Sequence, residues 1–322
     1  MSVDVSPDGS TLVFDFLGDL YTLPFDGGRA EPLTRGMAFD AQPRFSPDGT
    51  RVAFTSDRDG GENLWIISLD RADTTQITKG GRNSIQSPEW TPDGDYIVAT
   101  KAPSGPGSLY LYHVDGGSGV RLVDQPSNRR TTGAAFGADD RRIWHAYRTG
   151  AWTYNSSLRD YQLAVYDRET GEVERKSNRY GGAFRPVLSP DGRWLVYGTR
   201  HLADTGLRIR DLESGEERWL AFPVQRDDME SRASRDAYPG MSFTPDSRAL
   251  VATYGGKIWR IPVDGGEPAQ IPFEVDLDLD IGPLVDFDYA IDDSPTFHAK
   301  QIRDAVPSPD GGRLAFTVLN EL

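Results

Sequence analysis

Apolar and polar residues alternate along most of the chain in short runs, which is typical of half-buried β-strands. The runs belong to a repeating unit whose clearest marker is Pro-Asp-Gly, found at residues 7–9, 47–49, 92–94, 190–192 and 309–311. Two altered copies, Ala138-Asp139-Asp140 and Pro245-Asp246-Ser247, fill the intervals. Pro and Gly favour the backbone angles of a tight turn, and Asp can bond the backbone two residues on. Each of these seven copies, which we call nodes, therefore predicts a turn between two strands.

Apolar residues keep the same positions around every node. The second residue before the Pro position is Val5, Phe45, Trp90, Phe136, Leu188, Phe243 or Pro307. The fifth residue after it is Leu12, Val52, Ile97, Ile143, Leu195, Leu250 or Leu314. A third strand and a shorter fourth one follow in six units, as in DLYTLPFDGG (19–28) and AEPLT (30–34). Four antiparallel strands that recur about every 50 residues predict a β-propeller. A β-sandwich is the alternative, but it does not explain so long a period.

The number of nodes predicts an all-β, seven-bladed propeller whose last blade is incomplete. Six units have four strands, whereas the seventh stops after its second strand, with residues 319–322 where a third would begin. An open blade exposes unpaired edge strands, so we expect residues 1–322 to be a single propeller domain cut from a longer protein. A catalytic domain is then expected C-terminal to residue 322. The chain begins MSVDV and shows no signal peptide. This says nothing about where the full protein is located if the natural N-terminus is also missing.

Composition excludes several classes of function. The net charge of the chain is −14. This argues against nucleic acid as a partner, because a protein binds nucleic acid through a basic surface. The chain has no Cys, so disulfides, zinc–thiolate sites and Cys nucleophiles are excluded. No apolar run approaches the roughly 20 residues of a membrane-spanning helix.

The repeat resembles a known family. SPDG followed by LVF, then DLY, GG and a short LT strand, is similar to the TolB-like propeller repeat. Four longer stretches, at residues 1–24, 41–66, 238–261 and 288–322, resemble the N-terminal propeller of bacterial metal-dependent amidohydrolases. That resemblance implies that the full protein hydrolyses amide-type C–N bonds in a barrel domain that holds a metal ion, zinc being the expected one. It also suggests a periplasmic or extracellular location.

No catalytic motif of these families occurs in the chain itself. The Gly-x-Ser-x-Gly elbow of serine hydrolases is absent, and so is the His-x-His of metal-dependent barrels. The four histidines, His113, His145, His201 and His298, lie more than 30 residues apart. His113 and His145 are expected to be structural residues on strands, whereas His298 lies in an insertion and is a weak functional candidate. We expect no catalytic, cofactor-binding or metal-binding residue in this chain.

An acidic segment at residues 274–293 raises the question of a Ca²⁺ site. Asp276, Asp278 and Asp280 alternate with leucines, so in a strand all three would point to one face. Hard cations prefer several carboxylates, but the residues at the sixth and twelfth positions do not fit an EF-hand loop. A solvated acidic face is the interpretation we favour.

The central channel is the predicted functional surface, because the innermost strands of all blades converge there. Five residues before the Pro position, each unit carries a small or polar residue: Ser2, Gln42, Ser87, Gly133, Arg185, Gly240 or Asp304. Candidates for ligand binding at the channel mouth are therefore Gln42, Ser87, Arg185 and Asp304, together with His298.

The resulting hypothesis is a non-catalytic propeller that positions or filters substrate for an amidohydrolase. Its partner would be the C-terminal catalytic domain of the same protein, or another protein. Two alternatives stay open: a stand-alone TolB-like propeller that binds proteins, and the propeller of a prolyl oligopeptidase-type or tricorn-type serine peptidase.

Overall fold

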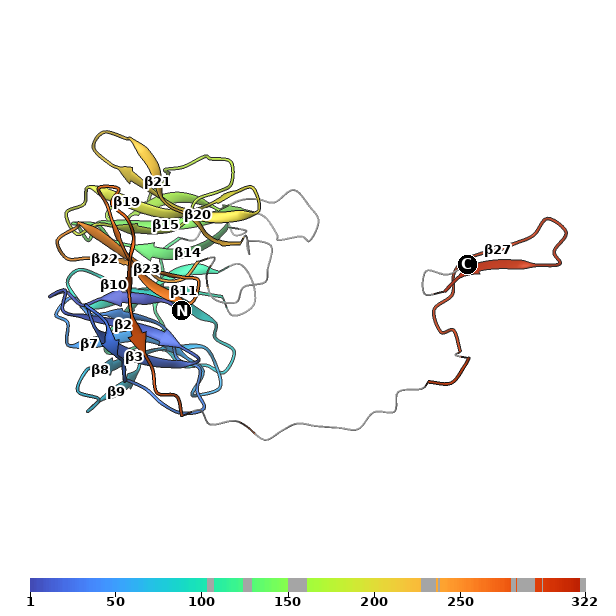
Figure 1. Ribbon diagram of the computed structural model, residues 1–322, viewed down its shortest axis with the longest axis horizontal. Helices are drawn as coiled ribbons and strands as arrows, with labels where there is room; N and C mark the ends of the chain where they lie inside the picture. The colour runs from blue at the N-terminus through green and yellow to red at the C-terminus, as the bar shows by residue number, and fades with distance from the viewer. Residues whose placement is uncertain are drawn as a thin grey trace. The chain divides into compact units, whose positions relative to one another are not determined.

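The computed structural model describes residues 1–102, 107–123, 129–149, 161–226, 236, 238–278, 282, 293–296 and 298–318. It contains two units, Met1–Ile281 and Gly282–Leu322. The regular elements of the described residues are all β-strands, many of which Figure 1 labels. No helix long and apolar enough to span a membrane occurs among them.

Six antiparallel four-stranded sheets, the blades, make up the first unit. The first blade contains β1 (Val3–Val5), β2 (Thr11–Phe16), β3 (Asp19–Pro24) and β5 (Glu31–Pro32). The second contains β6 (Ala41–Phe45), β7 (Arg51–Ser56), β8 (Asn63–Ser68) and β9 (Thr74–Gln76). The third contains β10 (Ile85–Trp90), β11 (Tyr96–Lys101), β12 (Ser108–His113) and β13 (Val120–Arg121).

The other three blades repeat this order. The fourth contains β14 (Arg129–Ala135), β15 (Arg142–Thr149), β16 (Gln162–Asp167) and β17 (Val173–Arg175). The fifth contains β18 (Phe184–Leu188), β19 (Trp194–His201), β20 (Asp204–Asp211) and β21 (Glu217–Arg226). The sixth contains β22 (Ser242–Phe243), β23 (Ala249–Tyr254), β24 (Lys257–Pro262) and β25 (Ala269–Ile271).

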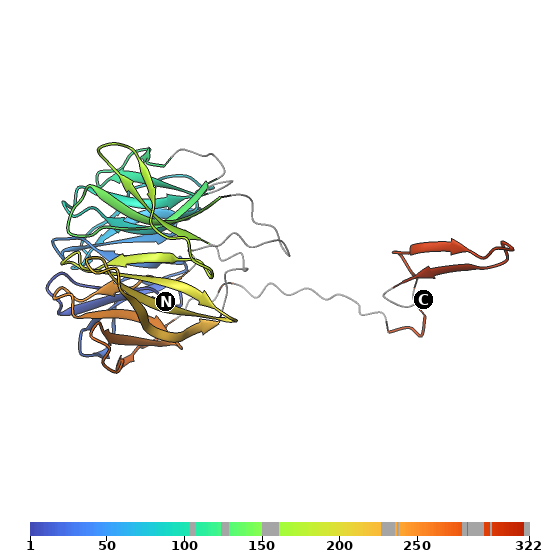
Figure 2. The ribbon, with the colours of Figure 1, turned by 90° about the horizontal axis from the view of Figure 1, so that it is seen from above.

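The six blades close into a ring, which confirms the predicted propeller of four-stranded blades. The innermost strands β1, β6, β10, β14, β18 and β22 contact one another in this order, and β22 and β23 contact β1. Figures 1 and 2 show the orange sixth blade beside the blue first blade. The backbone N–H of Val3 donates to the Gly240 carbonyl across this junction (3.1 Å). The sixth blade thus packs directly on the first, and the ring contains six blades where the number of nodes predicts seven.

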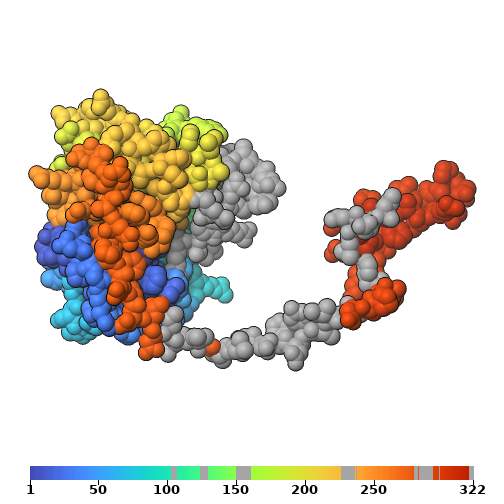
Figure 3. All heavy atoms as spheres, viewed as in Figure 1, coloured from blue at the N-terminus to red at the C-terminus, as the bar shows by residue number. Residues whose placement is uncertain are grey.

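A short strand from the end of the sixth blade fastens it to the first. β26 (Phe273–Glu274) pairs in parallel with β4 (Gly28–Arg29). The Phe273 ring packs edge-on against Phe14, with their centroids 5.1 Å apart. In Figure 3 the orange residues of this segment lie directly against the blue residues of the first blade.

Apolar residues at the predicted positions form the core between the blades. The aliphatic residue five places after the Pro position is at most 1% exposed in all six blades. It pairs across the two innermost strands with the apolar residue before the node, as in Val5↔Leu12, Phe45↔Val52 and Trp90↔Ile97. The repeated pattern therefore marks the residues that one blade buries against the next.

The node turns connect neighbouring blades as well as neighbouring strands. A Cβ added to Gly49 would lie 3.4 Å from the Pro7 ring of the preceding blade, and one added to Gly94 would lie 3.7 Å from the Pro47 ring. Gly9 and Pro245 make the same contact between the first and sixth blades, at 3.5 Å. The repeated Pro and Gly thus contact each other at three junctions between blades, the closing junction included.

The seventh node forms a hairpin in the second unit, as expected for an incomplete blade. Its strands are β27 (Arg303–Pro307) and β28 (Leu314–Thr317). Leu314, whose counterparts in the six blades are at most 1% exposed, is 58% exposed here. Residues 319–322, where a third strand was expected to begin, lie outside the described part of the chain.

Candidate functional site

The predicted channel residues sit at a bulge near the start of the innermost strands. The strand ladder shifts register around Gln42, Ser87, Gly133 and Arg185. All four have positive φ values, between 50° and 65°. A bulge with one residue in this conformation re-aims its side chain. At these four strands the sequence pattern of small or polar residues therefore marks the point where the strand bends at the centre of the ring.

Hydrogen bonds link these bulges across the blades. The Asp15 carboxylate accepts from the backbone N–H of both Ser2 (2.9 Å) and Gln42 (2.8 Å). Gln42 Oε1 in turn accepts from the backbone N–H of Ser87 (2.8 Å). The first three blades are thus joined at the ring centre by polar side chains that satisfy the backbone groups freed by the bulges.

Asp236, on the connection between β21 and β22, lies at the same level of the ring. Its Oδ2 accepts from Ser87 Oγ (2.5 Å) and from Arg185 Nη1 (2.8 Å). The Arg185 side chain is 3% exposed and that of Asp236 is 1% exposed. Burial lowers the pKa of the Arg185 guanidinium below its ordinary value, and the Asp236 carboxylate opposes this shift. The ion pair fills the ring centre between the third and fifth blades.

A second charged layer lies two residues further along the same strands. Arg44 Nη1 donates to Asp4 Oδ1 (3.1 Å), and its Nε lies 3.1 Å from Glu89 Oε2. Burial acts to lower the pKa of Arg44, but Glu89 and Asp4 outweigh it, and the pKa lies above its ordinary value. Burial raises the pKa of Glu89, which Arg44 only partly offsets. These three residues border a cavity of about 110 Å³.

The other candidates lie apart from this centre. Asp304 is on β27 of the second unit, where it again has a positive φ. His298 belongs to the same unit and is exposed. His145 is fully buried on β15, and His113 ends β12 beside Asp115, so both lie on strands as predicted. The roles of Gln42, Ser87, Arg185, Asp304 and His298 in binding stay predictions.

The structure offers no support for a metal centre in the described residues. No group of three or more acidic or His side chains among them is placed to hold a metal ion. Asp276 pairs with Arg29 of the first blade, and Asp280 lies outside the described part of the chain. The Asp276 carboxylate thus forms an ion pair at the junction between the first and sixth blades.

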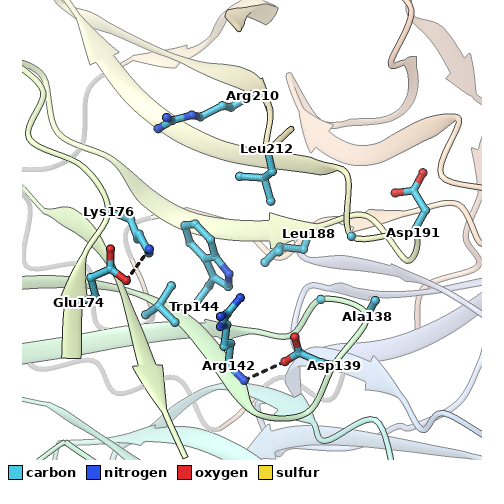
Figure 4. A pocket seen from close by; sticks show the side chains of 13 residues that line it. Ala138, Asp139, Arg142, Trp144, Glu174, Lys176, Leu188, Asp191, Arg210 and Leu212 are labelled. Carbon is cyan, nitrogen blue, oxygen red and sulfur yellow. Dashed lines mark hydrogen bonds and ion pairs between the residues drawn. The ribbon is translucent and has the colours of Figure 1, made fainter. Parts of the chain in front are cut away.

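A larger pocket, which the sequence did not predict, lies between the fourth and fifth blades (Figure 4). Its volume is about 620 Å³. Apolar side chains of both blades form its walls: Trp144 on β15, Val165 on β16, Leu188 on β18 and Leu212 after β20. Figure 4 shows the Trp144 side chain near the centre, with charged groups around it.

The pocket lies at the most altered node. Ala138 occupies the position that is Pro in the other six nodes. Five of those nodes read Pro-Asp-Gly and one reads Pro-Asp-Ser. A Cβ on Gly192 would lie 3.4 Å from the Ala138 methyl group, where the corresponding glycines Gly49 and Gly94 face a pyrrolidine ring. Gly137 likewise replaces the Ser or Thr that precedes the other nodes. The altered sequence of this node could have indicated the pocket. Loss of the Pro ring and of the Ser or Thr hydroxyl removes side-chain volume between these two blades.

The charged layer of Asp4, Arg44 and Glu89 was also missed. Its signal was the presence of opposite charges at one register position in three consecutive units, three residues before the Pro position. Asp236 had no comparable signal, because it lies on a connection outside the repeat.

Comparison with known proteins places these features in a family context. The family described as the tricorn protease N-terminal β-propeller domain matches residues 2–162. Tricorn protease homolog 1 of Streptomyces coelicolor is 35% identical over 281 residues, which is 82% of this chain and 24% of that protein. The chain thus spans about a quarter of the length of this relative.

Two solved structures share the fold. The crystal structure of the tricorn protease has a TM-score of 0.61 at 17% identity, covering 98% of this chain and 29% of that one. The structure of a putative TolB from Agrobacterium tumefaciens has a TM-score of 0.60 at 21% identity, covering 76% of this chain and 86% of that one. The predicted similarity to TolB-like propellers is confirmed at the level of the fold.

Proposed function

This chain belongs to the tricorn protease N-terminal β-propeller family, and from that membership we propose that it is the non-catalytic, peptide-handling propeller of a hydrolase. Its relationship to a tricorn protease homologue over 82% of its length supports this reading. The chain corresponds to only 24% of that relative. The proposal therefore assigns bond cleavage to a different domain and substrate handling to the propeller.

The filled ring centre is the observation that decides how the propeller would handle substrate. Arg185 and Asp236 are paired and almost fully buried in one layer, and Arg44 is paired with Asp4 and Glu89 in the other. The cavity beside the second layer, about 110 Å³, has room for only a few waters at about 30 Å³ each. Positioning of substrate on a face or in a groove fits this arrangement better than filtering by passage along the axis.

Two classes of hydrolase are candidates for the neighbouring catalytic domain, a peptidase and a metal-dependent amidohydrolase. A peptidase is favoured by the family match. The sequence stretches that resemble amidohydrolase propellers favour the second candidate, in which the neighbouring barrel holds a metal ion, expected to be zinc. The periplasmic or extracellular location stays a prediction.

Two measurements test the proposal. Fluorescein-labelled peptides of eight to twelve residues from a casein digest should bind the purified 322-residue chain, as followed by fluorescence anisotropy, without being cleaved. Cleavage by the chain alone, with or without added zinc, contradicts the division of labour. A complete gene sequence then separates the two classes of hydrolase, since a serine peptidase domain supports the first and a His-x-His barrel the second.

A further inference from the structure

The pocket between the fourth and fifth blades is lined by charged residues of both signs. Arg142 and Arg210 line it, and neither makes an ion pair with a carboxylate of the described residues. Lys176, the third cation, is paired with Glu174 (2.6 Å). An arginine next to apolar surface is the group most often used to hold a carboxylate in a peptide.

The aspartates of the pocket are already engaged in their own turns. Asp191 accepts from Ser189 Oγ and from the backbone N–H of Arg193 (3.0 Å). Asp139 accepts from the backbone N–H of Arg142 (3.0 Å), as the dashed line in Figure 4 shows. The groups left for a ligand are therefore the two guanidinium groups and the apolar wall between them.

The size and lining of the pocket indicate an extended ligand with an apolar part. A volume of about 620 Å³ is in the usual range of sites for small molecules and peptides. Trp144 is half-buried there, with Leu188 and Leu212 beside it. Trp and Arg are also the residues that contribute most to binding when they line a pocket.

The equivalent groove between the first and second blades shows that these cations are not a general property of the fold. That groove has a volume of about 370 Å³ and is bordered by Phe45 and Leu69. Its charged lining residues are Asp8 and Asp48, and no cation lines it. It also keeps Pro7, whereas the larger pocket has Ala138.

We propose that the pocket between the fourth and fifth blades binds a peptide segment in which an acidic side chain stands next to a large apolar one. The apolar side chain packs on Trp144 and Leu188, and the guanidinium groups of Arg142 and Arg210, on opposite sides of this apolar wall, each offer a site for the carboxylate. The proposal rests on the peptide-handling function proposed above and adds the site and the type of peptide.

Isothermal titration with two peptides tests this assignment. Both have blocked ends, Ac-Gly-Phe-Glu-Leu-Gly-NH2 and Ac-Gly-Phe-Gln-Leu-Gly-NH2, so the side-chain carboxylate is the difference between them. The Glu peptide is expected to bind the full chain about tenfold more tightly than the Gln peptide, because a charge-assisted hydrogen bond is lost in the latter. The double variant Arg142→Ala/Arg210→Ala should remove most of this preference while leaving the affinity for the Gln peptide nearly unchanged. Arg248→Ala, an exposed arginine at the node of the sixth blade, is the matched control.

Ala138→Pro provides an independent variant of the pocket. It restores the residue found at the other six nodes, and Ala138 N–H makes no backbone hydrogen bond within the described residues that a Pro would remove. We expect weaker binding of both peptides with no loss of thermal stability.

Each outcome bears on a distinct part of the proposal. Equal affinity for the Glu and Gln peptides, or an unchanged preference in the double variant Arg142→Ala/Arg210→Ala, overturns the site while other peptides can still bind elsewhere. N-acetylphenylalanine binding as tightly as the Glu peptide overturns the assignment to a peptide. If neither these peptides nor the casein peptides bind at millimolar concentration, the peptide-handling function itself is wrong.

Discussion

At the scale of single residues, the carboxylate of the repeated Asp stabilises the turns at the nodes. In the second node Asp48 Oδ1 accepts from Ser46 Oγ (2.5 Å), Thr50 N–H (3.0 Å) and Thr50 Oγ1 (2.9 Å). The same arrangement of a hydroxyl, the Asp and a backbone N–H recurs in five other nodes, at Asp8, Asp93, Asp191, Asp246 and Asp310. One carboxylate oxygen thus holds both sides of the turn.

Removing that carboxylate should weaken the turn measurably. We expect Asp48→Ala to lower the free energy of unfolding by about 1.5 kcal/mol, because a small set of partly exposed hydrogen bonds is lost. Asp48→Asn, which keeps an acceptor oxygen, should cost less. Urea denaturation gives both values. Asp95→Ala, an exposed residue of the third node, should change stability by less than about 0.5 kcal/mol; an equal loss there would contradict the explanation.

The pH dependence of this contribution has a defined sign. The hydrogen bond from Ser46 is the largest cause that lowers the pKa of Asp48 below its ordinary value. A carboxyl group whose pKa is lower in the folded state stabilises the fold above its unfolded pKa and loses that effect as the pH falls through the folded value. The difference between the wild type and Asp48→Asn should therefore be constant above pH 5 and shrink below about pH 3.8. A difference that grows on acidification would contradict the assignment.

Repeat register was enough to predict many residue positions, although not all of them. Gln42, Ser87 and Arg185 could be aligned from the sequence because each stands five residues before a Pro. Their partner Asp236 could not, because its connection has no counterpart in the other units. The pocket between the fourth and fifth blades was missed for a different reason: Arg142 and Arg210 belong to different blades, and whether they line one pocket depends on how the two blades pack.

At the scale of elements, the short strand β26 closes the ring. The backbone N–H of Gly28 donates to the Pro272 carbonyl (2.9 Å), and the N–H of Ala30 donates to that of Glu274 (2.8 Å). A Cβ on Gly27 would lie 2.3 Å from the Pro272 carbonyl oxygen. The segment after the sixth blade can therefore approach the first blade only because residue 27 has no side chain. Sequence periodicity could not predict this strand, since it has no equivalent in the other units.

Two neighbouring glycines allow this close approach to be tested. Gly27 and Gly28 both have positive φ, at 93° and 122°, so an Ala at either position is strained. Only Gly27 faces Pro272, because nothing lies within 4 Å of a Cβ on Gly28. We expect Gly27→Ala to be less stable than Gly28→Ala by about 1–3 kcal/mol, the cost typical of overpacking. Thermal denaturation of the two variants gives the comparison, and equal melting temperatures would show that β26 does not depend on this contact.

At the scale of the whole molecule, the sequence repeat correctly predicted a propeller of four-stranded blades. It did not determine how many blades close the ring. Each node reports only on its own strands, so seven nodes were counted as seven blades of one ring. The contact of Gly9 with Pro245 shows that the ring is complete after six. Leu314 of the seventh node keeps the repeated apolar position but is exposed.

The buried layer of Asp4, Arg44 and Glu89 gives the last prediction, because it joins three blades of the ring. Arg44→Met removes the cation and leaves two carboxylates in the ring centre, which should cost about 3 kcal/mol or more at pH 7.5. The pKa of Glu89, already raised by burial, should rise further without Arg44. A carboxyl group with a raised folded pKa becomes less destabilising as it is protonated, so the loss should shrink as the pH falls from 7.5 towards 4.5. Urea denaturation at these pH values, with Arg248→Met as the exposed control, measures it. A loss that is independent of pH would mean that Arg44 contributes through packing of its side chain and not through its charge.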